Sequence, residues 1–210
     1  MTRLKHIALS PLLALSLATP AVVFGVLTPV QASAGTSAME TFKAQHEAVV
    51  KLVKKKASSK TLEKQVDQLL DYRWVAFAAL GGEESYGDTC AERCDEFETL
   101  LGDLIRRNYL RMVRQASTHD VVYLGEKTGK TGAVKIDTEI TVKKNDRDQV
   151  VKVSYVMHEV EGSWQVRDII TDGVSLAKTY RYEFKQLLAD GGIDSVISKL
   201  KKKVDQLDAD

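Results

Sequence analysis

The sequence is short of proline, of cysteine and of net charge, and each shortage excludes a class of protein. All three prolines lie in the first 34 residues, so glycine and short polar residues supply the turns of the remainder. Two cysteines are too few for a disulfide-rich scaffold. From residue 35 onward there are 28 basic and 29 acidic residues, because two of the 30 basic residues lie earlier. This balance gives no general attraction to nucleic acid, so we expect no nucleic-acid partner.

The first 34 residues have the pattern of a signal peptide, and we expect them to be cleaved. Arg3 and Lys5 precede an uncharged apolar run over residues 7–27, and the segments 30–32 and 32–34 each offer a small-residue cleavage pattern. An uncleaved membrane anchor is the alternative, but two prolines interrupt the run. No later apolar run approaches the length of a membrane span. Residues 35–210 are therefore predicted to form one exported, soluble domain.

Cys90 and Cys94 are expected to form a disulfide, since export places them in an oxidising compartment. They lie four residues apart on a predicted helix, where Cβ atoms are about 5 to 6 Å apart. A disulfide prefers about 3.5 to 4.5 Å between the Cβ atoms, so the bond would locally unwind the first helical turn. The histidines at 46, 119 and 158 are scattered along the chain, so no metal site is predicted.

The order of hydrophobic periods predicts an α+β domain. Helical spacing dominates residues 38–116, where Thr89 and Glu92 have the spacing of a capping box and predict the start of a long helix. The period becomes two over residues 120–171, which predicts about four antiparallel strands joined by short turns. Helical spacing returns over residues 174–208. Helices before and after the strands are expected to gather on one face of the sheet.

The last predicted strand, near residues 163–170, carries a carboxylate on its apolar face. Asp168 has the parity of Trp164, Val166 and Ile170, and successive residues of a strand point to opposite faces. The pattern therefore predicts a buried acid, which needs a partner.

Two interpretations of Asp168 follow. The structural one is a carboxylate bonded to Arg181 or to turn amides near Gly173. The catalytic one is a general base in a cone-shaped cavity, where burial raises its pKa and a tyrosine such as Tyr155 or Tyr180 assists.

The segment from this strand to the end of the chain resembles a known family. The positions that carry the resemblance form a W-x-V-x-D segment, a G-V-S-L turn, a Y-R-x-x-F helix start and a closing G-x-D segment. These residues are Trp164, Val166, Asp168, Gly173, Val174, Ser175, Leu176, Tyr180, Arg181, Phe184, Gly192 and Asp194. The pattern is similar to that of the MlaC, or toluene-tolerance, family of periplasmic phospholipid carriers. One departure is the segment 83–94, where family members often carry a different sequence.

The resemblance implies a fold and a function. It implies a nuclear-transport-factor-like α+β domain, with N- and C-terminal helices around a deep apolar cavity. It also implies a soluble periplasmic carrier that binds phospholipid acyl chains and shuttles lipid between the outer and inner membranes, which maintains outer-membrane lipid asymmetry. The implied partners are an outer-membrane lipoprotein complex and an inner-membrane ABC transporter with an MCE-domain protein. Phospholipid is then the cargo, with no cofactor and no enzymatic step.

Apolar residues on the predicted helix and strand faces are the candidates for contact with acyl chains, although core packing would produce the same pattern. They are Trp74, Phe77, Leu101, Leu104, Ile140, Val151, Val153, Tyr155, Trp164, Val166, Leu176, Tyr180 and Phe184. Two other functions stay open at this point. One is the exported enzyme described above. The other is a structural adaptor that uses lysine-bearing helices to bind a membrane complex without binding lipid.

Overall fold

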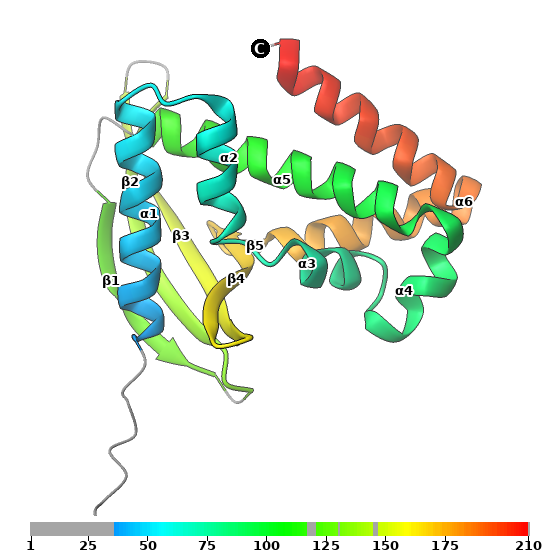
Figure 1. The fold of residues 1–210 in the computed structure, drawn as a ribbon, viewed down its shortest axis with the longest axis horizontal. Coiled ribbons are helices and arrows are strands. Elements are labelled where there is room, and N and C mark those ends of the chain that lie inside the picture. Colours follow the sequence, from blue (N-terminus) through cyan, green and yellow to red (C-terminus); the bar gives the residue numbers. More distant parts are fainter. Residues whose placement is uncertain (1–35, 117–120, 130, 145–146, 210) are drawn as a thin grey trace, which may run out of the picture. The chain divides into compact units, whose positions relative to one another are not determined.

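The computed structural model describes residues 36–209 except 117–120, 130 and 145–146 (Figure 1). The predicted signal peptide with its cleavage site, and His119, lie outside the described residues. Helices come first, then strands, then a C-terminal helical segment that is kinked at Gly191 and Gly192, so the predicted α+β order is confirmed. The helices are α1 (Ala38–Lys54), α2 (Ser59–Asp67), α3 (Tyr72–Ala79), α4 (Glu83–Cys90), α5 (Cys94–Ala116) and α6 (Leu176–Ala209), with a single 3₁₀ turn η1 (Ala91–Arg93).

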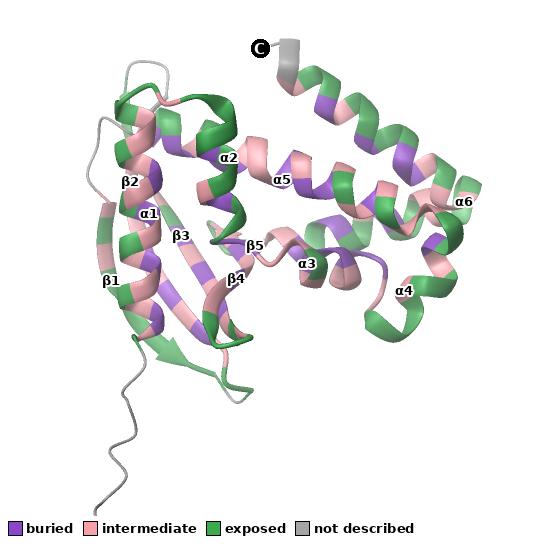
Figure 2. Cartoon of the chain, in the orientation of Figure 1, coloured by how far each residue is buried: buried purple, intermediate pink, exposed green. Residues whose placement is uncertain are grey.

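The sheet is antiparallel throughout and follows the chain order from β1 to β5. It has five strands instead of about four, because a two-residue strand joins the edge after β4. The strands are β1 (Val121–Thr128), β2 (Val134–Lys144), β3 (Arg147–Val160), β4 (Ser163–Thr171) and β5 (Val174–Ser175). Burial alternates along β3, where Val153, Tyr155 and Met157 face the core (Figure 2). One face of the sheet therefore carries the hydrophobic core.

Helix α1 packs on this inner face of the sheet. Its start is a capping box, in which the Ser37 Oγ accepts from the Glu40 N–H and the Glu40 carboxylate accepts from the Ser37 N–H. Phe42 is fully buried, and its ring lies 4.2 Å from the Tyr155 ring and 6.2 Å from the Tyr123 ring, centroid to centroid. These aromatic contacts fix α1 against β1 and β3.

The junction between α4 and α5 corrects one prediction. Thr89 does not cap a helix start: it belongs to the last turn of α4, where its hydroxyl donates to the Ser85 carbonyl. The long helix begins at Cys94. The sulfur atoms of Cys90 and Cys94 lie at bonding distance, and the Cα atoms are 4.8 Å apart. Ala91 between them has a positive φ of 46°, so the chain leaves the helical conformation where the two cysteines pair.

A β-bulge in β4 corrects another prediction. Met157 of β3 pairs with Val166, but the preceding Val156 pairs with Asp168, so Arg167 is an extra residue in β4. Beyond the bulge the parity is reversed, and Ile169 instead of Ile170 faces the core. Tyr155 pairs with Ile169 across the two strands, so Asp168 points to the opposite face of the sheet.

The bulge also links the sheet to the helical half of the chain. The Asp71 N–H donates to the Val166 carbonyl at 2.9 Å, and the Val166 N–H donates to the Leu69 carbonyl at 2.8 Å. The bulged Arg167 then donates from Nε to the Asp71 carboxylate at 2.9 Å. Asp71 also caps α3, since its other oxygen accepts from the Trp74 N–H at 3.0 Å. One side chain of 11% exposure therefore holds a helix start and a strand together.

Replacing Asp71 by alanine is expected to lower the free energy of unfolding by roughly 2 to 3 kcal/mol, because it removes a helix cap and leaves a half-buried guanidinium without its acceptor. Asp71→Asn keeps the capping oxygen and should lose less. The measurement is urea unfolding at neutral pH. The matched control is Asp205→Ala, on the exposed face of α6, which should stay within about 0.5 kcal/mol of the unchanged protein. Equal midpoints for Asp71→Ala and Asp205→Ala would contradict this role.

Candidate functional site

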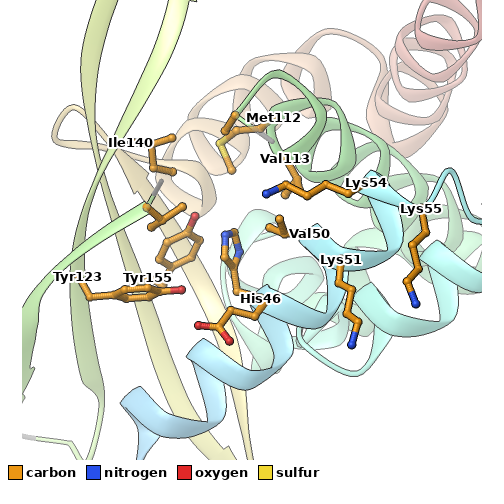
Figure 3. Close-up of a pocket in the computed structure, with 13 residues that line it drawn as sticks. His46, Val50, Lys51, Lys54, Lys55, Met112, Val113, Tyr123, Ile140 and Tyr155 are labelled. Atoms are coloured by element: carbon orange, nitrogen blue, oxygen red, sulfur yellow. The ribbon is translucent and has the colours of Figure 1, made fainter. Parts of the chain in front are cut away.

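A cavity of about 590 Å³ lies between α1, the end of α5 and the inner face of the sheet (Figure 3). We call it the larger cavity. Its volume is in the range of small-molecule binding sites. The lining residues are His46, Glu47, Val50, Lys51, Lys54, Lys55, Met112, Val113, Ala116, Val121, Tyr123, Ile140 and Tyr155.

The wall of the larger cavity changes character from the inside to the rim. Side chains from α5 and the strands are almost all apolar, whereas α1 and its C-cap residue Lys55 contribute Glu47 and three lysines. Figure 3 shows Lys54 extending toward the cavity, while Lys51 and Lys55 point away from its centre. The three lysines make no salt bridge with an acid within the described part of the chain. The site can therefore hold an apolar body inside and an anionic group at the rim.

A buried polar cluster lies at the inner end of the larger cavity. His46 has 4% exposure and Tyr155 has none. The His46 Nδ1 and the Tyr109 hydroxyl form a hydrogen bond of 2.9 Å. The His46 and Tyr155 rings lie 6.5 Å apart, centroid to centroid. No described protein group reaches the His46 Nε2 or the Tyr155 hydroxyl.

Burial shifts the titration of the whole cluster. It lowers the pKa of His46 to about 4, so the imidazole is neutral at physiological pH. Burial also raises the pKa values of Tyr109 and Tyr155 well above the usual value for tyrosine. It raises the pKa of Tyr123 to about 12, with Glu47 adding to the effect. The inner end of the cavity is therefore polar but uncharged.

A second cavity of about 270 Å³ lies beside the first, between α5, β4, β5 and the start of α6. We call it the smaller cavity. Met112 of α5 lines both cavities and is the residue they share. The residues around the smaller cavity are Ile105, Asn108, Tyr109, Met112, Ile169, Thr171, Val174, Leu176, Thr179 and Tyr180.

The candidate acyl-chain contacts fall into three groups. Ile140 and Tyr155 line the larger cavity, and Leu176 and Tyr180 line the smaller one. The other nine line neither cavity. Of these, Leu101, Leu104, Val153, Val166 and Phe184 are packed in the core, and Val151 is packed against it.

The three remaining aromatic candidates have local structural contacts. Trp164 donates from Nε1 to the carbonyl of Thr36 at 3.1 Å. Trp74 stacks near His158, with ring centroids 6.4 Å apart. Phe77 makes an edge contact with Tyr86, with centroids 4.7 Å apart.

Asp168 does not occupy the position that its parity predicted. It accepts a hydrogen bond from the Ser175 hydroxyl at 2.6 Å and one from the Ala177 N–H at 3.1 Å, so it anchors the start of α6. Arg181 is exposed and is not its partner. The expected pairing with Arg181 is therefore wrong, whereas an anchoring role through groups just after Gly173 agrees with the structural interpretation. Asp168 lines neither cavity, so it does not face Tyr155 or Tyr180 as a general base would.

Several cavity residues were absent from the candidates drawn from the sequence. His46 lies on the apolar face of the first helix together with Phe42 and Val49, and an ionisable residue in an apolar stripe was a signal for it. Met112 and Tyr123 carried no comparable signal, because their side chains fit an ordinary core equally well.

Within the described ranges, no group of three or more His, Cys, Asp and Glu side chains could hold a metal ion. Over the same residues, no helix has the length and apolar character that crossing a membrane requires.

Comparison with known proteins places the chain in a family. The sequence profile described as MlaC protein matches residues 36–202, which is most of the chain. The chain belongs to the MlaC family. The intermembrane phospholipid transport system binding protein MlaC of Haemophilus influenzae is 24% identical over 122 residues. That match spans 58% of this chain and 57% of the relative, a little over half of its length.

A solved structure has the same fold as this member of the MlaC family. It is the phospholipid-binding protein of Ralstonia solanacearum, determined in complex with a phospholipid. The likeness has a TM-score of 0.67 at 19% identity and covers 82% of this chain and 99% of that chain. At this identity the likeness shows the fold alone.

Acid is expected to weaken the fold through His46. Its folded pKa of about 4 lies below the ordinary value of 6.5, so the stability due to neutral His46 is present above pH 6.5 and is lost as the pH falls toward 4. The loss between pH 6.5 and 4.5 is on the order of 2 to 3 kcal/mol. Urea unfolding of the unchanged protein and of His46→Gln at both pH values measures it. The variant should lose less stability on acidification, and an unchanged loss would contradict the prediction.

Proposed function

We propose that this protein is a periplasmic phospholipid carrier that encloses acyl chains in the larger cavity. The observation that carries the proposal is an apolar space of about 590 Å³, open at a lysine-bearing rim, in a chain of the MlaC family. The solved structure of the same fold contains a phospholipid, which supports the same cargo here. Phospholipid is bound and released unchanged, so the proposed function uses no cofactor and no covalent step.

The physical reason for an enclosed cavity is the cost of exposing lipid tails. A diacyl lipid has about thirty methylene groups, and each contributes about 0.8 kcal/mol, so its tails cost roughly 24 kcal/mol to expose to water. A bilayer already shelters these tails. The carrier therefore needs only to offer a comparably apolar environment, which the side chains of α5 and the strands provide.

The rim orients the cargo. Lys51, Lys54 and Lys55 supply positive charge where a phosphate would meet solvent, and the inner wall excludes charge. The lipid therefore enters with its tails inward and its headgroup at α1.

The cellular role that we propose follows the family. The predicted signal peptide sends the chain to the periplasm, where it carries lipid between an outer-membrane lipoprotein complex and an inner-membrane ABC transporter with an MCE-domain protein. This transfer maintains the lipid asymmetry of the outer membrane. The adaptor alternative differs from the carrier in one respect, because an adaptor docks on such complexes without containing lipid.

Val50→Glu is expected to remove bound lipid, since it places a carboxylate in the wall of the larger cavity. Val50 is only half buried, so the domain should stay folded. The protein is purified from a bacterial periplasm, and native mass spectrometry measures the fraction that carries phospholipid. We expect at least a tenfold loss in the variant.

The matched control is Val150→Glu, the same substitution at a β3 position of 56% exposure that lines neither cavity. It should retain lipid like the unchanged protein. Folded but lipid-free unchanged protein in repeated preparations would refute the carrier and favour the adaptor.

A further inference from the structure

Two side chains that line the larger cavity each carry a buried polar atom with no hydrogen-bond partner in the described protein. These atoms are the Tyr155 hydroxyl, on a side chain with no exposure, and the Nε2 of His46, which has 4% exposure. Figure 3 shows both side chains at the inner end of the cavity, one from β3 and one from α1. An apolar acyl chain alone cannot satisfy them, and a buried polar group without a partner is destabilising.

The hydrogen bond between His46 and Tyr109 decides whether the other ring nitrogen of His46 is a hydrogen-bond donor or an acceptor. His46 is neutral, so one ring nitrogen carries a proton and the other accepts. A phenol O–H is a better donor than a neutral imidazole N–H, and the imidazole nitrogen is a strong acceptor. Tyr109 therefore donates to Nδ1 across the 2.9 Å contact, and the proton lies on Nε2. His46 then presents a donor to the cavity, as Tyr155 also can.

The uncharged, buried surroundings of these two donors limit which ligand atom they can bind. Both groups are neutral, and the buried rings of Phe42 and Tyr109 lie beside them, so an ion would be costly here. A neutral carbonyl oxygen satisfies a donor without bringing charge into the cavity. In a diacyl phospholipid such oxygens occur only at the start of the tails, in the ester groups.

The position of His46 along α1 agrees with this chemistry. Lys51 and Lys54 follow His46 by five and eight residues, which is about 7 to 12 Å along the helix axis. A phosphate at the lysine rim is joined to its ester groups by a short glycerol unit. The ester carbonyls therefore come within reach of the inner end of the cavity when the headgroup stays at the rim.

We propose that Tyr155 and His46 form a carbonyl-binding pair that recognises the acyl ester groups of the lipid cargo and sets how deeply the lipid enters. The inference rests on the proposed carrier function and adds its substrate class, which is ester-linked lipid. A free fatty acid offers a neutral carbonyl oxygen when its carboxyl group is protonated and is the other source of this chemistry. Ether-linked lipids have the same tails and headgroup but no carbonyl, so they separate the two kinds of contact.

The first test compares three ligands on the unchanged, delipidated protein. Binding is measured by titration with a diester phospholipid, a diether phospholipid of equal chain length and headgroup, and a fatty acid of the same chain length. We expect the diester to bind about tenfold more tightly than the diether. Equal affinities would overturn the carbonyl pair and leave the carrier function standing. No binding of either phospholipid would instead refute the carrier function, and tighter binding of the fatty acid would assign the pair to a free carboxyl group and overturn the ester assignment.

The second test removes the donor without changing the packing. Tyr155→Phe keeps the ring that packs on Phe42 and deletes only the hydroxyl. It should weaken diester binding several-fold and leave diether binding unchanged, so the ratio of the two affinities falls. The matched control is Tyr182→Phe, at a helix position of 70% exposure, which should keep the ratio of the unchanged protein. A Tyr155→Phe variant with the full diester preference would exclude Tyr155 from the pair.

Discussion

The extra residue in β4 is the constraint on which the two halves of the structure depend. Arg167 is the bulged residue and has no pairing partner in β3. Its guanidinium reaches Asp71 at the start of α3. The same bulge reverses the parity of the strand, so Ile169 faces the smaller cavity and Asp168 turns away to anchor α6. A regular strand would point Asp168 into the core, leave the start of α6 without its acceptor and take the Arg167 guanidinium away from Asp71. One inserted residue thus positions the starts of α3 and α6, the helices that precede and follow the sheet along the chain.

Helix α1 both packs against the hydrophobic core and lines the larger cavity. Its first half buries Phe42 and His46 against Tyr155 and Tyr109, and these contacts are close and aromatic. Its second half carries the lysines and leaves open space between itself and α5. The wide aromatic side chains of Phe42 and Tyr155 pack between α1 and the sheet at one end, and Val50 of α1 and Ala116 of α5 border the open space at the other.

Periodicity was sufficient to predict the order of helices and strands, because long amphipathic segments such as α5 repeat their apolar positions over several turns. It failed at α4, whose residues Glu83–Cys90 have no apolar stripe, and at the bulge, because parity assumes an unbroken ladder. The site was harder to predict. An apolar side chain has the same pattern whether it packs against another side chain or borders a space, so Phe184 and Ile140 could not be distinguished.

The chemistry of the cavity bears on how a carrier can both hold and release lipid. Tail burial is nearly balanced between a bilayer and an apolar cavity, so it contributes little to the direction of exchange. The difference in the free energy of the lipid between the cavity and the bilayer therefore depends on contacts that a bilayer interior does not offer. The uncharged donors of Tyr155 and His46 and the lysines at the rim are such contacts. Each adds only a modest free energy, typically about 1 kcal/mol for a neutral hydrogen bond. A few such contacts together retain a bound lipid. The lipid can still be released when a receiving site offers the tails an equally apolar environment.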